Sequence, residues 1–323
     1  MNSIGGLAGD ASYHVAWPGA DDTMNDIDNK RWALALHGGA GPVPGRDYSE
    51  TEKHLGELAA VCRERLEAGQ SSLDIVEFAV CEMETSGLYV AGRGSAQNSA
   101  GYVELDASIM SGPTRAAGAV AALQDVVNPV SVARGVMDKT PHLLLAGTGA
   151  LAFAKRSGYE LVEDPASWYR LPIGVMPEEF TGRAHGTVGA VALDTTGALA
   201  AATSTGGTFG KLEGRVGDTP LVGSGTWADD DVAISCTGVG ERIIRAGGAV
   251  SVAMRCRAGM PLEAAVDELL DEISRLGGDA GVIAVTSRGE IAMRYNSDGM
   301  KRASVSAGTG IESATFAGKG ERQ

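Results

Sequence analysis

Along this chain, segments with the apolar spacing of helices alternate with short apolar runs typical of strands. Together they predict a mixed α/β protein between residues 31 and 295. Apolar positions three and four apart indicate amphipathic helices, whereas short apolar runs bounded by glycine indicate buried strands. The predicted helices cover two segments within 50–86, one segment opened by Asn128-Pro129, one ending at Lys155, and 241–257 and 261–276. The predicted strands cover 31–36, 103–110, 118–123, 187–194, 198–203, 231–236, and a hairpin of 282–286 with 291–295. This order favours helices covering two stacked sheets over a doubly wound nucleotide-binding fold.

Two segments interrupt this pattern. Residues 1–29 mix Gly, Ser and Asn with aspartates and show no sustained period, which predicts a disordered extension before a single domain over 30–323. Residues 156–186 contain Pro165, Pro172 and Pro177, which break any regular element and predict a flexible, exposed connector.

The strand after this connector has an unusual first residue. Thr187 directly follows Gly186, and the run from Val188 to Leu193 is small and apolar. If the Gly186–Thr187 bond were cut, Thr187 would carry a hydroxyl and an α-amine, whose ordinary pKa of about 7.7–8.0 suits a base near neutral pH. Such a base activates a threonine hydroxyl as a nucleophile. The alternative is an ordinary strand that begins with threonine because threonine favours strands.

Composition narrows the class of protein. The chain has 323 residues, 44% of them apolar, and its 46 glycines cluster beside apolar runs, which indicates close backbone packing around a site. The net charge of −14, with no basic stripe, argues against nucleic acid and anionic membranes as partners. No apolar run reaches the length of a membrane span, and the start of the chain lacks the layout of a secretion signal. The four cysteines have no metal-ligand spacing, so reduced thiols and a cytoplasmic location are expected: Cys62, Cys81, Cys236 and Cys256.

Polar groups recur at strand ends downstream of Thr187. Arg215 and Asp218 lie three apart in a glycine-flanked loop and match the two charges of a free α-amino acid; the alternative is a surface ion pair. Thr237 and Gly238 end a strand and offer a hydroxyl and an N–H to a developing oxyanion, or form an ordinary turn. Thr205 either supports Thr187 or satisfies strand backbone.

The first predicted strand runs into His37-Gly38-Gly39-Ala40-Gly41. The glycines allow a close backbone approach, but their spacing fits neither phosphate-loop pattern. His37 is either catalytic or, as is commoner for a lone histidine beside glycines, a satisfied structural group.

Taken together, these motifs closely resemble the plant-type asparaginase/isoaspartyl peptidase family of N-terminal-nucleophile hydrolases. The likeness extends over about residues 31–310 and includes the His37–Gly41 motif. Its other segments are 186–194, 200–207, 214–223 and 235–238.

The resemblance implies an α+β fold, a four-layer αββα sandwich made as an inactive precursor. Self-cleavage between Gly186 and Thr187 would give an α subunit, 1–186, and a β subunit, 187–323, and two cleaved chains would form an (αβ)2 homodimer. It implies no cofactor, apart from a structural sodium ion held by backbone carbonyls of a loop near residues 80–92. The side chains themselves leave the metal unknown.

The resemblance also implies residue roles. Thr187 resembles the nucleophile and Thr205 the hydroxyl that supports it. Arg215 resembles the holder of the substrate α-carboxylate and Asp218 the partner of its α-amine. The oxyanion donors correspond to Thr237 and Gly238, and Gly240 corresponds to backbone lining the same pocket.

One position departs from the family pattern. The family usually has Asn before the Ala-Gly of an Asn-Ala-Gly-x-Gly loop, and Val90 stands there in this chain. A valine neither donates nor accepts, so the leaving-group contacts are expected to change, and Arg93 is a candidate to face the leaving side instead.

The expected activity is hydrolysis of β-aspartyl amide bonds, in isoaspartyl dipeptides and in L-asparagine, through Thr187. Two alternatives stay open: a glycosylasparaginase-like enzyme acting on Asn-linked glycans, and a non-catalytic binder of small ligands.

Overall fold

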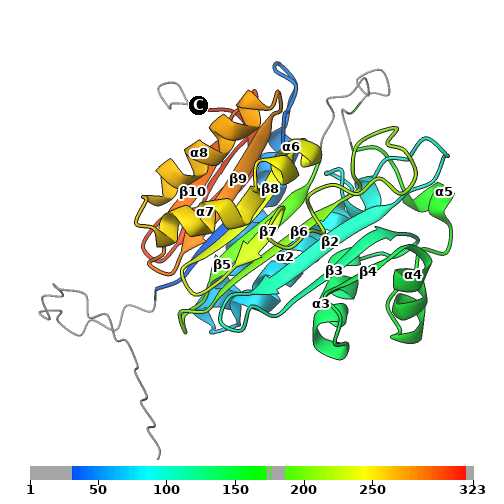
Figure 1. Cartoon of the computed structure of the whole chain (residues 1–323), viewed down its shortest axis with the longest axis horizontal. Helices are drawn as coiled ribbons and strands as arrows, with labels where there is room; N and C mark the ends of the chain where they lie inside the picture. Colours follow the sequence, from blue (N-terminus) through cyan, green and yellow to red (C-terminus); the bar gives the residue numbers. More distant parts are fainter. Residues whose placement is uncertain (1–30, 173–174, 176–185, 318–323) are drawn as a thin grey trace, which may run out of the picture.

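The computed structural model describes residues 31–172, 175 and 186–317. Within these ranges the chain forms two β-sheets and several helices, which confirms the mixed α/β prediction (Figure 1). None of the helices in this part of the chain combines the length and the apolar character needed to cross a bilayer. The extension predicted at 1–29 lies outside the described residues.

An eight-stranded sheet occupies the centre of the molecule, in the order β12-β11-β1-β5-β6-β2-β3-β4. The bounds are β1 Ala33–Ala40, β2 Leu105–Ser111, β3 Ala117–Leu123, β4 Leu144–Ala146, β5 Val188–Leu193, β6 Leu199–Thr205, β11 Met300–Ser306 and β12 Glu312–Ala314. Neighbouring strands are antiparallel except β3 and β4. Every residue of β1, β5 and β6 is buried. Because both faces of these central strands are covered, they appear in the sequence as mostly small and apolar runs.

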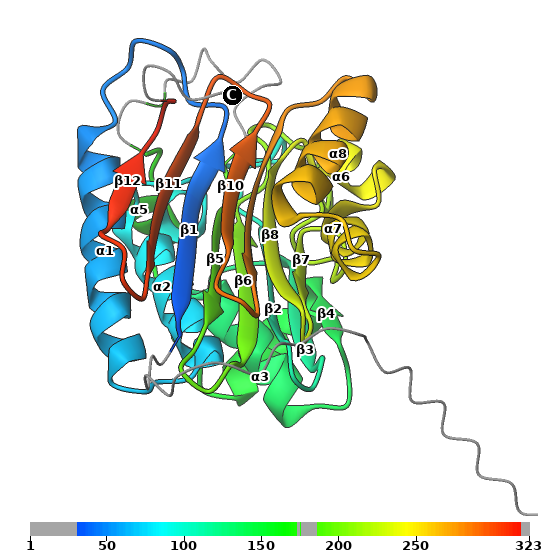
Figure 2. The same ribbon diagram turned by 90° about the vertical axis from the view of Figure 1, so that its left-hand side faces the viewer.

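Helices cover one face of this sheet (Figure 2). They are α1 Ser49–Glu67, α2 Ser72–Ser86, α3 Pro129–Lys139 and α4 Gly147–Arg156. The side chain of Ser71 caps the start of α2, and Gly87, at φ 74°, ends it in the left-handed conformation that favours glycine. The apolar stripe that predicted these helices, including Leu55 and Val76, is buried against the sheet in one continuous core.

A second, four-stranded sheet packs on the first, in the order β10-β9-β8-β7. Its strands are β7 Thr226–Ala228, β8 Val232–Gly238, β9 Ala280–Thr286 and β10 Ile291–Tyr295. Between the two sheets lies an apolar cluster that includes Ala35, Val191 and Ile283. Two helices, α7 Gly248–Arg257 and α8 Leu262–Arg275, cover the small sheet through a core of their own.

Several elements differ from the prediction. The helix expected over 241–257 is two helices, α6 Gly240–Arg245 and α7, because Gly247 and Gly248, just before α7 and at its first residue, both adopt positive φ. Strands β7, β11 and β12 were not predicted, although β11 pairs with β1. The expected connector, 156–186, begins with a defined segment that includes the short helix α5 Pro165–Trp168, and most of its later residues lie outside the described ranges. A single 3-10 turn, η1 Gly92–Gly94, follows α2.

Candidate active site

Thr187 lies at the entry of the central strand β5 and is only 5% exposed. Strand β5 pairs with β6 in a register that places Val188 opposite Ser204. The residues one step beyond that pair, Thr187 and Thr205, therefore meet at the end of the two strands. Their hydroxyl oxygens are 3.4 Å apart.

Thr205 joins the hydroxyl of Thr187 to the peptide bond before it. Its Oγ1 accepts from the amide of Gly207 at 2.9 Å and donates to the carbonyl oxygen of Gly186 at 2.6 Å. Because its own proton goes to Gly186, Thr205 accepts the proton of the Thr187 hydroxyl. The nucleophile candidate and the Gly186 carbonyl are thus linked through one side chain.

His37 holds the other side of Thr187. Its Nδ1 donates to the carbonyl oxygen of Thr187 at 3.1 Å, and its Nε2 lies 2.9 Å from the hydroxyl of Ser235 in β8. Burial lowers the pKa of His37 to about 3, so the ring is neutral at neutral pH and Nε2 accepts from Ser235. A neutral ring with both nitrogens engaged matches the structural alternative for His37.

The hydrogen bonds continue from Ser235 between the two sheets. Ser235 lies 2.7 Å from the hydroxyl of Thr203, which also accepts from Thr226. The hydroxyl of Ser108 shares its one proton between the Thr226 hydroxyl and the carbonyl oxygen of Thr219. All of these hydroxyls are buried, so the chain satisfies polar groups inside an otherwise apolar core.

Arg215 and Asp218 lie together, but they do not form the ion pair that the spacing allowed. The guanidinium of Arg215 binds Glu241 with two hydrogen bonds of 2.8 Å, from Nε and Nη2. Asp218 is 4% exposed, its Oδ2 has no hydrogen-bond partner within the described part of the chain, and burial raises its pKa to about 7. A buried carboxylate oxygen with no donor is costly unless a ligand supplies one.

The residues expected to offer oxyanion donors, Thr237 and Gly238, are the last two residues of β8. Thr237 is fully buried and its Oγ1 accepts from the amide of Ala40 at 3.2 Å, which leaves its proton to donate. Gly238 has φ 141°, and a Cβ there would lie 2.3 Å from the carbonyl oxygen of Asp279. Gly240 packs on Asp218, because a Cβ there would lie 2.9 Å from Asp218 Oδ1.

A small cavity of about 10 Å³ brings most of these groups together. Its lining is Gly186, Thr187, Thr205, Gly207, Thr208, Arg215, Gly217, Asp218, Thr219 and Gly238. The predicted Thr237 and Gly240 are not part of this lining. The volume suits about one water molecule, because Gly186 occupies the side next to Thr187.

Sequence reasoning missed Ser235 and Glu241. Glu241 follows the Gly238–Gly240 turn at the start of α6, so an acidic residue after a glycine-rich strand end was the available signal. Ser235 lies 198 positions from His37, and no local pattern indicates that contact.

Arg93 does not compensate for Val90. Its guanidinium stacks on Trp168, at 4.9 Å from the ring centre. Arg93 lines neither the small cavity nor a second cavity of about 300 Å³ that Val90 lines. Val90 is buried against Gly186, since a Cβ on Gly186 would lie 2.2 Å from the Val90 Cβ. Among the described residues, no three His, Cys, Asp or Glu side chains group as they would around a metal ion.

Comparison with known proteins gives a consistent result. Residues 30–314 match the model of a family described as asparaginase. An isoaspartyl peptidase of Salmonella typhimurium is 41% identical over 293 residues, which cover 84% of this chain and 94% of the relative. A probable isoaspartyl peptidase/L-asparaginase 2 of Arabidopsis thaliana is 38% identical over 321 residues, and the match again covers 84% of this chain and 94% of the relative. A plant-type L-asparaginase of Thermococcus kodakarensis is 36% identical, covering 85% of this chain and 97% of the relative.

These matches confirm the resemblance seen in the sequence motifs. The chain therefore belongs to the asparaginase family that includes isoaspartyl peptidases and plant-type L-asparaginases.

Proposed function

We propose that the chain is a precursor that cleaves itself between Gly186 and Thr187 and then hydrolyses β-aspartyl amide bonds. Its substrates are isoaspartyl dipeptides and L-asparagine. The observation that carries this proposal is the hydrogen-bonded path from the Thr187 hydroxyl through Thr205 to the Gly186 carbonyl. The names of the relatives support the substrate class.

Self-cleavage begins when Thr187 Oγ1 adds to the carbonyl carbon of Gly186. Thr205 donates to the oxygen that becomes negative, which stabilises the addition. The bond between that carbon and the Thr187 nitrogen then breaks, and the nitrogen takes the proton that the Thr187 hydroxyl gave up and becomes an amine. Water hydrolyses the remaining ester, leaving a carboxylate on Gly186 and a free hydroxyl and amine on Thr187.

The size of the small cavity fits this order of events. A space of about 10 Å³ does not admit an aspartyl group while Gly186 occupies the leaving side. Departure of Gly186 opens that side. The substrate site is therefore a product of the cleavage.

Hydrolysis then repeats the same chemistry on the substrate. The α-amine of Thr187 takes the hydroxyl proton, Oγ1 attacks the side-chain carbonyl, and the amine passes the proton to the leaving nitrogen. The aspartyl ester is hydrolysed by water. Thr237 and Gly238 stabilise the oxyanion of both steps, and the retained proton of Thr237 supports that role.

The substrate is held by its two α-substituents. Asp218 accepts its ammonium through Oδ2, the oxygen that has no donor among the described residues. Arg215 donates to its α-carboxylate through N–H groups beyond the two that Glu241 uses, and Nη1 faces Gly217. Gly240 leaves room for Asp218, because any side chain there would press against the carboxylate.

The finer features of the assembly belong to the same proposal. The sheets with their helices form the four-layer αββα sandwich of N-terminal-nucleophile hydrolases, and two cleaved chains associate as (αβ)2. All four cysteines lie in the described ranges as free thiols, which supports a cytoplasmic location. Sedimentation of the cleaved protein as a single species of two α and two β chains is the expected result, and a lone αβ pair would contradict it.

A structural sodium ion would bind the loop after α2, by hard backbone oxygen ligands. The carbonyls of Glu84 and Tyr89 turn toward Gly92 and Gly94, where a Cβ would lie 2.4 and 1.9 Å from them. This close-packed loop has the backbone oxygens that a hard cation prefers. The ion would keep the loop beside Val90 in place and take no part in the reaction.

The activity is tested by assaying the purified protein with β-aspartyl-leucine, L-asparagine and an asparagine-linked glycan. We expect hydrolysis of the first two and none after Thr187→Ala, while Thr195→Ala, in the turn after β5, keeps the wild-type rate. Activity on the glycan alone would point to the glycosylasparaginase-like alternative. Ligand binding without hydrolysis, equal in wild type and Thr187→Ala, would point to a binder.

A further inference from the structure

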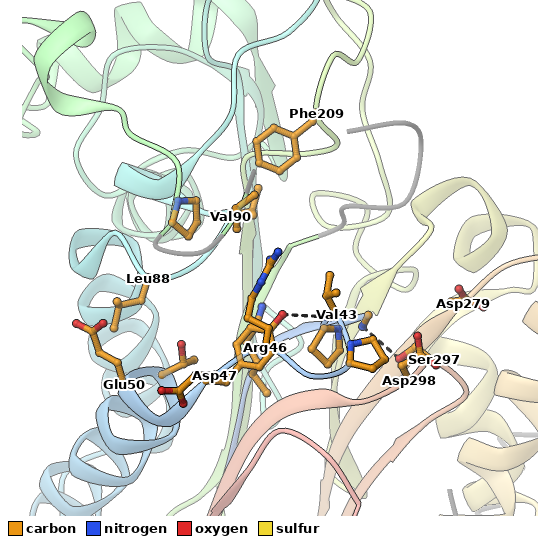
Figure 3. A pocket seen from close by; sticks show the side chains of 18 residues that line it. Val43, Arg46, Asp47, Glu50, Leu88, Val90, Phe209, Asp279, Ser297 and Asp298 are labelled. Carbon is orange, nitrogen blue, oxygen red and sulfur yellow. Dashed lines mark hydrogen bonds between the residues drawn. The ribbon is translucent and has the colours of Figure 1, made fainter. Parts of the chain in front are cut away.

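A second cavity, of about 300 Å³, is lined by residues that include Leu88, Val90 and Phe209 (Figure 3). Val90 forms part of its wall and also packs on Gly186, so the wall separates this cavity from the small one around Thr187. Its size lies at the lower end of the range for small-molecule sites. The proposed mechanism does not use it.

The two cavities are neighbours at Gly186 and Val90. Arg215, Asp218 and Gly238 line the small cavity on the Thr187 side. Gly186 lines the same small cavity and packs on Val90, which lines the larger one. With the aspartyl group held by Arg215 and Asp218 in the small cavity, the leaving group extends away from these two residues, toward Val90 and the larger cavity.

Lys301, the second residue of β11, supplies a cation to this cavity. Its Nζ donates to the carbonyl of Gly38 at 3.4 Å and lies 5.5 Å from the centre of the Tyr48 ring. Among the described residues it has no carboxylate within salt-bridge distance. A half-buried ammonium without an anion is a site for one.

The charged groups of the cavity are arranged by depth. Lys301 and Arg46 are half-buried, whereas the carboxylates at the cavity, Asp47, Glu50, Asp279 and Asp298, are exposed. Asp47 already accepts from the amide of Ser49. The inner part of the cavity therefore favours an anion, and its rim disfavours an acidic side chain.

We propose that this cavity binds the leaving amino acid of an isoaspartyl dipeptide, with Lys301 holding its α-carboxylate and apolar walls receiving its side chain. Those walls include Leu88, Val90 and Phe209. L-Asparagine releases only ammonia and gains nothing from these groups. This inference rests on the proposed function and explains what Val90 does in place of an amide: it makes the leaving side apolar.

The test compares kcat/KM for β-aspartyl-leucine and L-asparagine in the wild type and in Lys301→Met. Loss of a charge-assisted contact lowers kcat/KM for the dipeptide about 10- to 100-fold. The value for L-asparagine changes less than about threefold, because its leaving group does not reach Lys301. Lys155→Met, on the exposed end of α4, is the matched control and leaves both values unchanged.

A wild-type measurement gives a second readout that does not depend on the variant folding. Burial and the neighbouring Arg46 lower the pKa of Lys301 to about 8. Because kcat/KM reports the free enzyme, the ratio of dipeptide to asparagine kcat/KM falls about tenfold from about pH 7 to about pH 9. Titration of Thr187 affects both substrates and cancels in the ratio.

Equal losses on both substrates in Lys301→Met would overturn the inference, because Lys301 would then act on Thr187 through Gly38. A ratio independent of pH in the wild type would overturn it as well. In both cases the wild type still hydrolyses β-aspartyl bonds, so the proposed function stands. A wild type inactive on both substrates would instead refute the proposed function, and this inference with it.

Discussion

The substitution Ser235→Ala tests whether the hydrogen bond between Ser235 and His37 helps to hold Thr187 in place. The Ser235 hydroxyl is fully buried in β8 and lies 2.9 Å from His37 Nε2 and 2.7 Å from Thr203 Oγ1. The carbonyl of Thr187 can only accept, so His37 Nδ1 carries the ring proton and Nε2 depends on Ser235 for its donor. The substitution therefore removes one identifiable hydrogen bond.

The magnitude follows from burial. His37 has no exposed surface, so its Nε2 would keep no partner, at a cost of about 1–3 kcal/mol in the free energy of unfolding. Thr203 loses less, because its hydroxyl also reaches the carbonyl of Gly225 at 3.3 Å. With one of its two contacts gone, the His37 ring holds the Thr187 carbonyl less firmly. A misplacement of about 1 Å slows a reaction as much as about 100-fold, so self-cleavage slows as well.

Urea unfolding measures the loss in the free energy of unfolding. It is carried out in a Thr187→Ala background, in which every variant stays a single chain. Ser313→Ala is the control, because that hydroxyl donates to the Glu52 carbonyl far from Thr187, and its loss costs about 0.5–1.5 kcal/mol. Slower self-cleavage is measured as the rate at which the two fragments appear, in proteins that retain Thr187. A Ser235→Ala protein as stable as its parent, and cleaving at the parent rate, would refute the role assigned to the His37–Ser235 contact.

Three further outcomes are expected. Burial raises the pKa of Asp218 to about 7, and only its ionised form accepts an ammonium. We therefore expect kcat/KM to rise with pH through about pH 7, in a step that the pH profile of kcat lacks. A kcat/KM profile without that step would contradict the role assigned to Asp218. Arg215→Lys keeps the charge but loses the planar fork, so KM for L-asparagine rises about tenfold or more while kcat changes less; an unchanged KM would exclude the contact. Gly186→Ala forces a Cβ against Val90, at 2.2 Å, and slows self-cleavage at least tenfold on a denaturing gel, whereas Gly310→Ala, with open space around it, cleaves normally.

The sequence was sufficient to predict the elements that carry the site. The apolar runs of β5 and β6 and the threonine at one end of each run determined that Thr187 and Thr205 meet, because antiparallel neighbours share a register. The glycine-flanked loop likewise brought Arg215 and Asp218 to one cavity. These predictions depended on local pattern and on a resemblance with specific motifs.

Contacts between distant segments could not be predicted in the same way. His37 and Ser235 lie on different sheets, and only the packing of the sheets brings them together. Strand β11 was missed because Arg302 and Ser304 interrupt its apolar pattern, although both are buried. The break at Gly247 and Gly248 was missed because the apolar spacing continues across it. Lys301 reads as an ordinary polar residue until the fold places it beside Gly38.

The account depends above all on where the chain is cut, and intact-mass measurement of the purified, active protein tests this directly. We predict two chains that meet between Gly186 and Thr187, with the second beginning Thr-Val-Gly-Ala, and one uncut chain for Thr187→Ala. An active protein that remains a single chain, or whose second fragment begins at any other residue, would contradict it.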